Sequence, residues 1–335
     1  MELTTVWFVL IAILWIGYFV LEGFDFGVGM LLLVLGRSDR ERRVLLNTIG
    51  PVWDGNEVWL LVAGGATFAA FPDWYATLFS GFYLALFLIL VALIVRGVAF
   101  EYRSKRPEPG WRMRWDRAIV VGSLVAPLLW GVAFANIVHG VPIDAQQEYT
   151  GDLITLLNPW GLLGGLTLVA LFLTHGALFL ALKTDGDLRA RANRMAGRVG
   201  LGAAVLAVCF LGWAQLTRGG GLSLALTVVA AVALVGGLAA NRLGRERVAF
   251  AGTAVTIAAA VASLFAGLFP DVMPSTLNAA YSLTTTNASS TDYTLTIMTW
   301  VAVIFTPLVL LYQGWTYWVF RRRLSVEQTP AAGEQ

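Results

Sequence analysis

Long apolar stretches alternate along the chain with short segments rich in charged residues. A helix that crosses a lipid bilayer needs about 20 mostly apolar residues. The pattern predicts nine such helices, over residues 4–35, 50–71, 76–100, 118–139, 159–182, 196–216, 222–241, 248–269 and 294–320. We therefore expect an all-α integral membrane protein with a single transmembrane domain over residues 1–323. The polar residues 324–335 predict a disordered cytoplasmic tail.

Composition agrees with this fold class. Hydrophobic residues make up 58% of the 335 residues and charged residues 13%, whereas a soluble domain carries about 25% charged residues. The single cysteine, Cys209, excludes an intrachain disulfide. No basic segment precedes the first apolar run, which is also too long for a signal peptide, so we expect this helix to remain in the mature protein.

Basic residues indicate the orientation. Lysine and arginine gather after the first, third, fifth, seventh and ninth predicted helices, whereas the opposite segments hold Arg218 as their only basic residue. The positive-inside rule then places the N-terminus outside and the C-terminus in the cytoplasm. The asymmetry also supports nine helices, because one missed helix would invert every later segment.

Two of the apolar stretches contain paired carboxyls: Glu22 with Asp25, and Asp54 with Glu57. Residues three apart share one helix face, and a charge at the bilayer centre costs at least about 2.5–3.5 kcal/mol. We therefore expect these side chains to face protein rather than lipid. Counted from the cytoplasm, the predicted order by depth is Asp54, Glu57, and then Asp25 and Glu22.

This series of carboxyls has two interpretations. Acids that step from the cytoplasm to the middle of the membrane are what a proton uptake path needs. Alternatively, they hold the helices together, and Asp54 lies close enough to the start of its helix for the backbone dipole to stabilise its charge. The residues alone leave both open.

Arg96 lies near the cytoplasmic end of the third predicted helix. Glu101 follows one turn beyond, and Asp116 starts the fourth helix. An intramembrane arginine can pair with an acid, bind an anionic group of a cofactor, or extend to the lipid headgroups. These alternatives also stay open at this point.

Side chains that bind metals or haem are scarce. His139 lies at an outer helix end and His175 within the fifth helix, without a His-x-x-x-His or Cys-x-x-Cys pattern. The methionines show no pairing with histidine of the kind that ligates haem. We expect His175 to bond to a neighbour, and we expect neither a metal site nor a catalytic residue in this chain.

Several segments occur together in an order typical of one family. GFDFGVG (residues 23–29), followed by GPVWDGNEVWL (residues 50–60), resembles the signature of subunit II of cytochrome bd quinol oxidases. The likeness continues at residues 64–72, 79–83, 96–105, 157–162 and 298–303, and is weakest in the sixth to eighth helices. Several long motifs in the same order make this a specific signal.

The resemblance implies a complex. It predicts two four-helix bundles plus one peripheral helix, paired with a similarly folded subunit I that carries the b-type haems, the d-type haem and the quinol site. Such a complex oxidises quinol near the outer face and reduces dioxygen with protons from the cytoplasm, without pumping. We expect a multi-pass protein of the bacterial cytoplasmic membrane, embedded in lipid, with small single-helix accessory subunits as further candidate partners and no nucleic acid.

The resemblance also implies roles for single residues. Asp25 and Asp54 match acidic residues implicated in a proton channel, and Glu57 and Glu22 are their neighbours in the predicted path. Glu57 stands where the family also has glutamine. A structural quinone occurs in this subunit of some members, so one is a candidate cofactor here.

A second set of positions is linked in the family to haem integrity or assembly. Trp53, Arg96 and Asp116 match these positions, and we group Glu101 with them as residues that support the haem or the partner. His139 and His175 lie outside the family motifs.

The leading hypothesis is an oxidase subunit that scaffolds the haem-bearing subunit and supplies a cytoplasmic proton path. The alternative is a proton- or cation-coupled secondary transporter that uses the same carboxylates and works alone. A third interpretation is an assembly scaffold whose acids only bind helices together.

Overall fold

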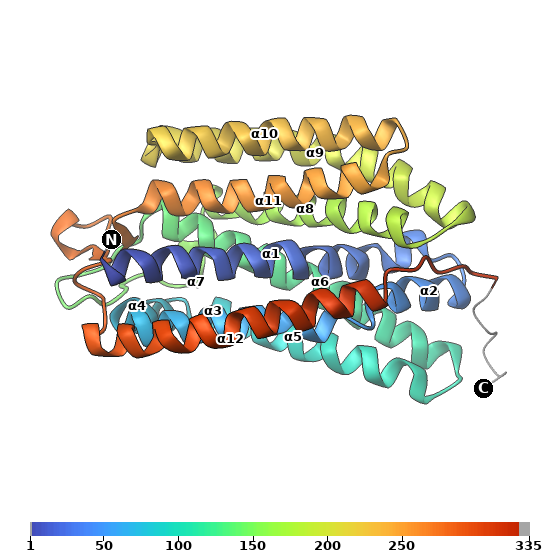
Figure 1. The fold of residues 1–335 in the computed structure, drawn as a ribbon, viewed down its shortest axis with the longest axis horizontal. Coiled ribbons are helices and arrows are strands. Elements are labelled where there is room, and N and C mark those ends of the chain that lie inside the picture. Colours follow the sequence, from blue (N-terminus) through green and yellow to red (C-terminus); the bar gives the residue numbers. More distant parts are fainter. Residues whose placement is uncertain (1, 328–335) are drawn as a thin grey trace.

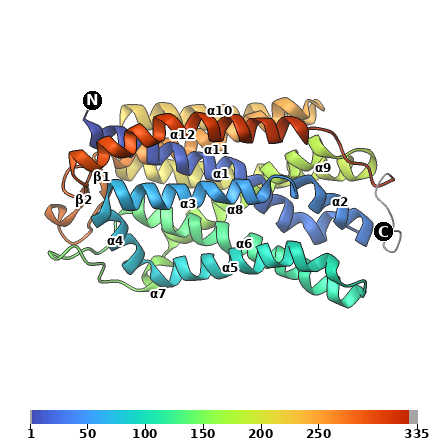
Figure 2. The same cartoon turned by 60° about the horizontal axis from the view of Figure 1, so that its bottom comes forward.

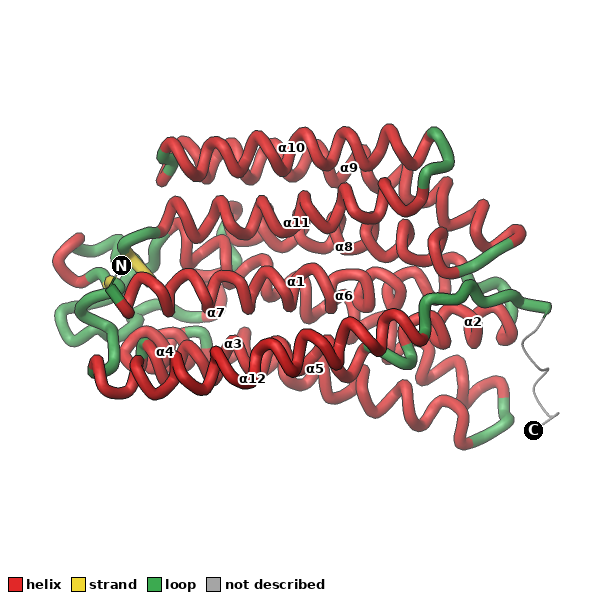
Figure 3. Tube along the Cα trace, in the orientation of Figure 1, coloured by secondary structure: helices red, strands yellow, loops and turns green. Residues whose placement is uncertain are grey.

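Long helices run side by side along one axis in the computed structural model, which describes residues 2–327 (Figure 1, Figure 3). The long helices of this part of the chain are α1 (Leu3–Leu35), α3 (Trp53–Ala70), α5 (Tyr83–Tyr102), α6 (Pro109–His139), α8 (Pro159–Lys183), α9 (Gly186–Arg218), α10 (Gly221–Arg242), α11 (Glu246–Leu268) and α12 (Asp292–Val319). The shorter elements are α2 (Asp39–Ile49), α4 (Pro72–Gly81), η1 (Arg103–Lys105), α7 (Leu153–Leu156), β1 (Asp271–Met273), η2 (Ala279–Tyr281) and β2 (Leu283–Thr284).

Within residues 2–327, eight helices are long and apolar enough to cross a membrane. This confirms the predicted class of an all-α integral membrane protein. The helix of the second predicted span, α3, is not among the eight. It has 18 residues, and Asp54, Asn56 and Glu57 in its first two turns lower its mean hydropathy.

The segment after α1 is a helix, where the sequence pattern indicated only a basic connection. Ser38 begins α2, because its hydroxyl accepts a hydrogen bond from the backbone N–H of Glu41 at 3.2 Å. Val44, Leu45 and Ile49 lie on one side of α2 and are fully buried. A helix this short gives no membrane signal, so a search for long apolar runs misses it.

Other boundaries differ because helices continue beyond the apolar run. The predicted span 76–100 is divided into α4 and α5 at Phe82. The span predicted from residue 118 begins at Pro109, and the span predicted from residue 196 begins at Gly186. Charged turns at these helix ends carry the chain past the predicted limits.

The central helix is α1, which packs against α3, α6, α8 and α11. A glycine pair allows α1 and α8 to approach closely. A Cβ added to Gly27 would lie 2.0 Å from the carbonyl oxygen of Phe172, and one added to Gly176 would lie 2.5 Å from the backbone of Gly27. Small residues at such crossings are typical of membrane helix packing.

The two ends of the bundle differ. At one end, β1 pairs antiparallel with β2, and the segment before α7 joins this cap through the backbone N–H of Val141, which donates to Pro274 at 3.0 Å. At the other end lie α2 and the last described residues (Figure 1). There the backbone N–H of Leu324 donates to Lys183 at 2.8 Å. Residues 328–335 of the predicted tail lie outside the described residues.

We expect Gly27→Ala to lower stability by about 1–3 kcal/mol, because the added methyl overpacks the contact between α1 and α8. Gly202→Ala is the matched control, since a Cβ there has no neighbour within 4 Å. Thermal unfolding of the detergent-solubilised protein measures both. Equal midpoints of thermal unfolding for the two variants would contradict a close packing of α1 against α8 at Gly27.

Candidate functional site

A buried arginine joins three helices inside the membrane-spanning part. Arg96 of α5 is fully buried, and its Nη1 donates to Oε1 of Glu22 on α1 and, at 2.9 Å, to Oε1 of Glu57 on α3. Glu22 is fully buried, whereas the side chain of Glu57 is 23% exposed. Of the three alternatives for Arg96, the structure shows pairing with the acids.

Aromatic rings enclose this arginine. The guanidinium carbon lies 4.6 Å from the ring centre of Phe26 and 5.2 Å from that of Phe100. Phe100 in turn packs on the ring of Trp53, with centroids 4.9 Å apart. Trp53 is thus connected to Arg96 through the ring of Phe100.

Asp25 lies on the same helix as Glu22, three residues further on, and is fully buried. Its Oδ2 accepts a hydrogen bond from Nδ2 of Asn56 at 2.6 Å. The carbonyl oxygen of this asparagine accepts from Nε2 of Gln313 at 3.1 Å and from the hydroxyl of Tyr317 at 2.8 Å. A network of polar side chains therefore runs from α12 through α3 to Asp25.

Four buried polar groups near these acids have atoms without a hydrogen-bond partner in the described part of the chain: Oδ1 of Asp25, Oε2 of Glu22, Nε and Nη2 of Arg96, and the hydroxyl of Tyr18. An unsatisfied buried polar atom costs about 1–3 kcal/mol. The free carboxyl oxygens and the tyrosine hydroxyl are suited to binding water or exchanging a proton, whereas the arginine nitrogens can only donate hydrogen bonds.

The remaining predicted acids lie elsewhere. Asp54 is exposed on the surface of α3, and Glu101 is exposed at the end of α5. The structure thus brings Glu22, Asp25 and Glu57 together and leaves Asp54 on the outside of this chain.

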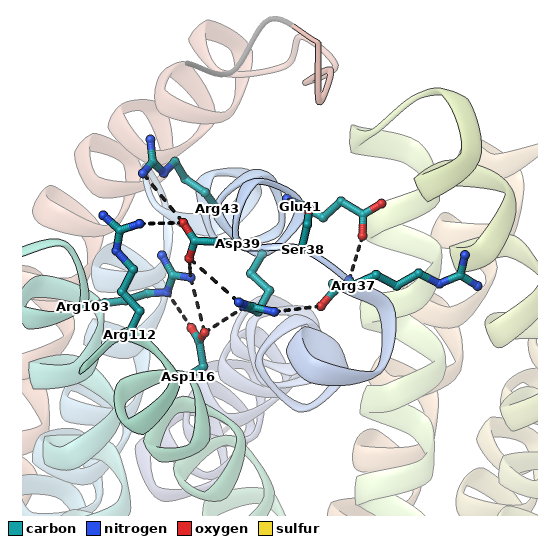
Figure 4. Close-up of polar contacts among 10 residues, drawn as sticks. Arg37, Ser38, Asp39, Glu41, Arg43, Arg103, Arg112 and Asp116 are labelled. Carbon is teal, nitrogen blue, oxygen red and sulfur yellow. Dashed lines mark hydrogen bonds and ion pairs between the residues drawn. The ribbon is translucent and has the colours of Figure 1, made fainter. Parts of the chain in front are cut away.

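Asp116 belongs to a second cluster, at the end where α2 lies (Figure 4). It is fully buried, and its carboxylate accepts from Nε of Arg103 at 2.5 Å and pairs with Nε of Arg42 at 2.9 Å. Arg103 also donates to Asp39 at 2.7 Å, as does Arg112 at 2.8 Å. These ion pairs fasten α2 to the junction of α5 and α6.

Asp39 titrates within this cluster. Burial alone would raise the pKa of its carboxyl, but the charges of Arg103, Arg112 and Arg42 outweigh this effect and lower the pKa below its ordinary value. The carboxylate therefore stays ionised, and keeps its arginines bound, into mildly acidic conditions.

The two histidines lie in different surroundings. The Nδ1 of His175 lies 2.7 Å from the hydroxyl of Thr253, and its Nε2 lies 3.2 Å from the carbonyl oxygen of Val20. This agrees with the expectation of a bonded histidine. His139 is exposed at the end of α6. Among residues 2–327 no group of three metal-binding side chains is present.

Sequence reasoning did not single out Asn56, Gln313, Tyr317 or Tyr18. Asn56 carries a signal, since it is a buried amide between two acids in an otherwise apolar segment. Gln313 and Tyr317 are one turn apart on the last helix, and their partner lies far away in the sequence, so only the fold relates them to Asp25.

Comparison with known proteins gives a consistent result. Residues 3–320 match the model of the family described as cytochrome bd terminal oxidase subunit II. The chain is 44% identical over 332 residues to cytochrome bd ubiquinol oxidase subunit 2 of Bacillus subtilis (strain 168), with 97% of each chain covered. It is 39% identical over 363 residues to cytochrome bd-I ubiquinol oxidase subunit 2 of Escherichia coli (strain K12), covering 96% of this chain and 95% of the relative.

A solved structure shares the fold. The bd oxidase from Geobacillus thermodenitrificans contains a chain that superposes with a TM-score of 0.79 at 17% identity, covering 96% of this chain and 99% of that chain. At this identity the likeness concerns the fold alone.

We expect Arg96→Gln to destabilise the protein by about 3–5 kcal/mol, because it leaves the buried Glu22 without its charged partner. Arg106→Gln is the control, since Arg106 is exposed and lies over the ring of Trp111. Thermal unfolding in detergent compares the two variants. If Arg96→Gln lowered the melting temperature no more than Arg106→Gln, the buried ion pairs of Arg96 would contribute little to stability.

The cluster at α2 predicts a dependence on pH. A carboxyl whose pKa is lowered by folding stabilises the folded state above its ordinary pKa of about 3.9, and this contribution disappears as the pH falls through the lowered value. The native protein should therefore melt at a higher temperature than Asp39→Asn at neutral pH, and this difference should become smaller as the pH falls into the acid range. Asp73→Asn, at an exposed position of α4, should show no such trend. A difference for Asp39→Asn that persisted or grew in acid would refute this assignment.

Proposed function

Because the chain belongs to the cytochrome bd terminal oxidase subunit II family, we propose that it serves as a subunit of a membrane quinol oxidase. In this role it holds a haem-bearing subunit I in place and conducts protons from the cytoplasm toward the site where dioxygen is reduced. The observation that carries the proposal is the fully buried Asp25, which has one bonded and one free carboxylate oxygen beside the Arg96 ion pairs.

The topology that supports this role has nine transmembrane helices, with α3 as the second, the N-terminus outside and the C-terminus in the cytoplasm. The basic segments between α1 and α3, α5 and α6, α8 and α9, and α10 and α11 supply the argument for orientation. In this layout α1, α3, α5 and α6 form one four-helix bundle, α8 to α11 form the other, and α12 is peripheral. The contacts of α8 with α9 and of α10 with α11 are in line with this division.

The proposed path starts at the surface of α3. Asp54 is exposed and Glu57 is half-buried one turn further along the helix. Glu57 shares Arg96 with Glu22, which lies one turn from Asp25 on α1. Protons entering beside Asp54 would thus meet groups of increasing burial, ending at Asp25.

Subunit I would cover the surface that carries Asp54. A carboxylate exposed to lipid at membrane depth is costly, so this face of α3 is better suited to a protein partner than to acyl chains. The exposed apolar side chains of Val58, Leu61 and Val62 on the same helix are available for that contact.

The haems are assigned to the partner on the chemistry of the side chains. Both ring nitrogens of His175 are occupied, one by the hydroxyl of Thr253 and the other by the carbonyl oxygen of Val20. This histidine therefore does not fit the role of a haem ligand. Accessory single-helix subunits remain a prediction.

A structural quinone, if bound, would have its apolar tail in a cavity of about 270 Å³. This cavity is lined by α1, α6, α8, α9, α10 and α11, with Leu171, Phe210 and Leu264 among the lining residues. The hydroxyls of Thr167 and Thr256 at its wall are bonded to backbone carbonyls, so the lining suits a hydrocarbon chain better than a polar head group.

The transporter alternative is not favoured. The relatives that match over nearly the full length are named as oxidase subunits.

We expect Asp25→Asn and Asp54→Asn to slow quinol-driven oxygen consumption by about 10²-fold, the usual scale for removing a positioned proton-transfer group. The variants are made in the complete complex, and haem absorption bands establish that assembly is intact. Asp73→Asn, at an exposed position outside the proposed path, is the control.

Two outcomes would contradict the proposed path. Unchanged oxygen consumption with intact haem bands would remove Asp25 and Asp54 from it. Loss of the haem bands in these variants would assign the two carboxyls to assembly instead.

A further inference from the structure

The last long helix touches the bundle in two separate places. Leu295 is the one buried residue of α12, and near it the indole N–H of Trp7 donates to the hydroxyl of Thr299 at 3.1 Å. Residues 303–312, which include Pro307, are exposed. Beyond them α12 meets α3 again through Gln313 and Tyr317, and Figure 2 shows α12 lying along the outside of the other helices.

At this second contact, the indole N–H of Trp59 sets the direction of the hydrogen bonds. The indole nitrogen of Trp59 can only donate, and it bonds to Oε1 of Gln313 at 2.9 Å. The amide of Gln313 therefore presents its Nε2 to the carbonyl oxygen of Asn56.

The hydroxyl of Tyr317 donates to the same oxygen of Asn56. With its carbonyl oxygen between two donors, the asparagine must direct its Nδ2 toward Asp25. The alternative orientation would place amide N–H groups against other donors, and buried unmatched donors are costly. Two residues of α12 thereby decide how Asn56 faces Asp25.

This arrangement distinguishes the two oxygens of Asp25. Its Oδ2 receives the N–H of Asn56 and cannot at the same time present a proton in that direction. Its Oδ1 is buried and has no partner in the described part of the chain. On the proposed path, Oδ1 is therefore the oxygen of Asp25 that is available to exchange a proton.

We propose that Gln313 and Tyr317 are positioning residues that orient the amide of Asn56 and so reserve one oxygen of Asp25 for the proton. This inference rests on the proposed function, because it assigns α12 a part in the path through Asp25. Neither residue touches the reacting groups, and both act through Asn56.

If Gln313 and Tyr317 only attached α12 to the bundle, their contact would not need to involve a group bonded to Asp25. The other end of α12 is attached through the indole N–H of Trp7, which donates to the carbonyl oxygen of Leu295 and to the hydroxyl of Thr299. The contact at Gln313 and Tyr317 instead brings two polar side chains to a fully buried amide whose other end is bonded to Asp25. The chain of hydrogen bonds thus ends on Asp25, the last group of the proposed path.

The test uses the complete oxidase complex with Tyr317→Phe and Gln313→Leu in this chain. We expect kcat for quinol-driven oxygen consumption to fall about three- to tenfold, as for loss of one hydrogen bond, while KM for quinol stays unchanged. The pH profile of kcat should change as well, since the proton-binding oxygen is no longer fixed. Tyr312→Phe, at an exposed position of the same helix, should match the native complex in all three measurements.

Each outcome decides the question. Native kcat and an unchanged pH profile in both variants, with Asp25→Asn slow, would overturn this inference and leave the proposed path standing. A fast Asp25→Asn would overturn the path itself. Loss of haem bands in Tyr317→Phe, which retains the ring, would show that the contact anchors α12 and does not position Asn56.

Discussion

The structure depends on one requirement, which is that the charge of Arg96 be neutralised inside the membrane. An unpaired charge at that depth is costly, and the guanidinium meets this requirement by bonding Glu22 on α1 and Glu57 on α3. Because its partners come from different helices, the pairing fixes α1, α3 and α5 relative to one another. Removing one partner of a buried ion pair lowers stability far more than removing an exposed ion pair does. The positions of the three helices are therefore fixed by this pairing.

The same requirement separates the carboxyls by role. Glu22 and Glu57 are engaged with Arg96, whereas Asp25 bonds to a neutral amide and keeps a free oxygen. Among these three acids, Asp25 is thus the one whose bonded partner is neutral. The fold places this acid beside the ion pairs of Arg96.

Much of this was predictable from the sequence. Apolar length predicted the eight helices that are long and apolar enough to cross a membrane. The spacing of Glu22 and Asp25 predicted that the two share one face of α1. The capped helix α2 was missed because its Ser38 cap and its buried Val44 lie outside any long apolar run. The bonds from Gln313 and Tyr317 to Asn56 could not be predicted because they depend on how α12 meets α3, and no local pattern encodes that contact. The exposure of Asp54 depends on which side of α3 the other helices cover, which is also a property of the whole fold.

The central claim is that Asp25 changes protonation as the complex turns over. The most direct measurement is the infrared difference spectrum between the reduced and the oxidised complex, recorded for the native protein and for Asp25→Asn with equal haem content. The account predicts a carboxyl C=O band in the native spectrum that is absent from the variant. Identical spectra in the carboxyl region would contradict it.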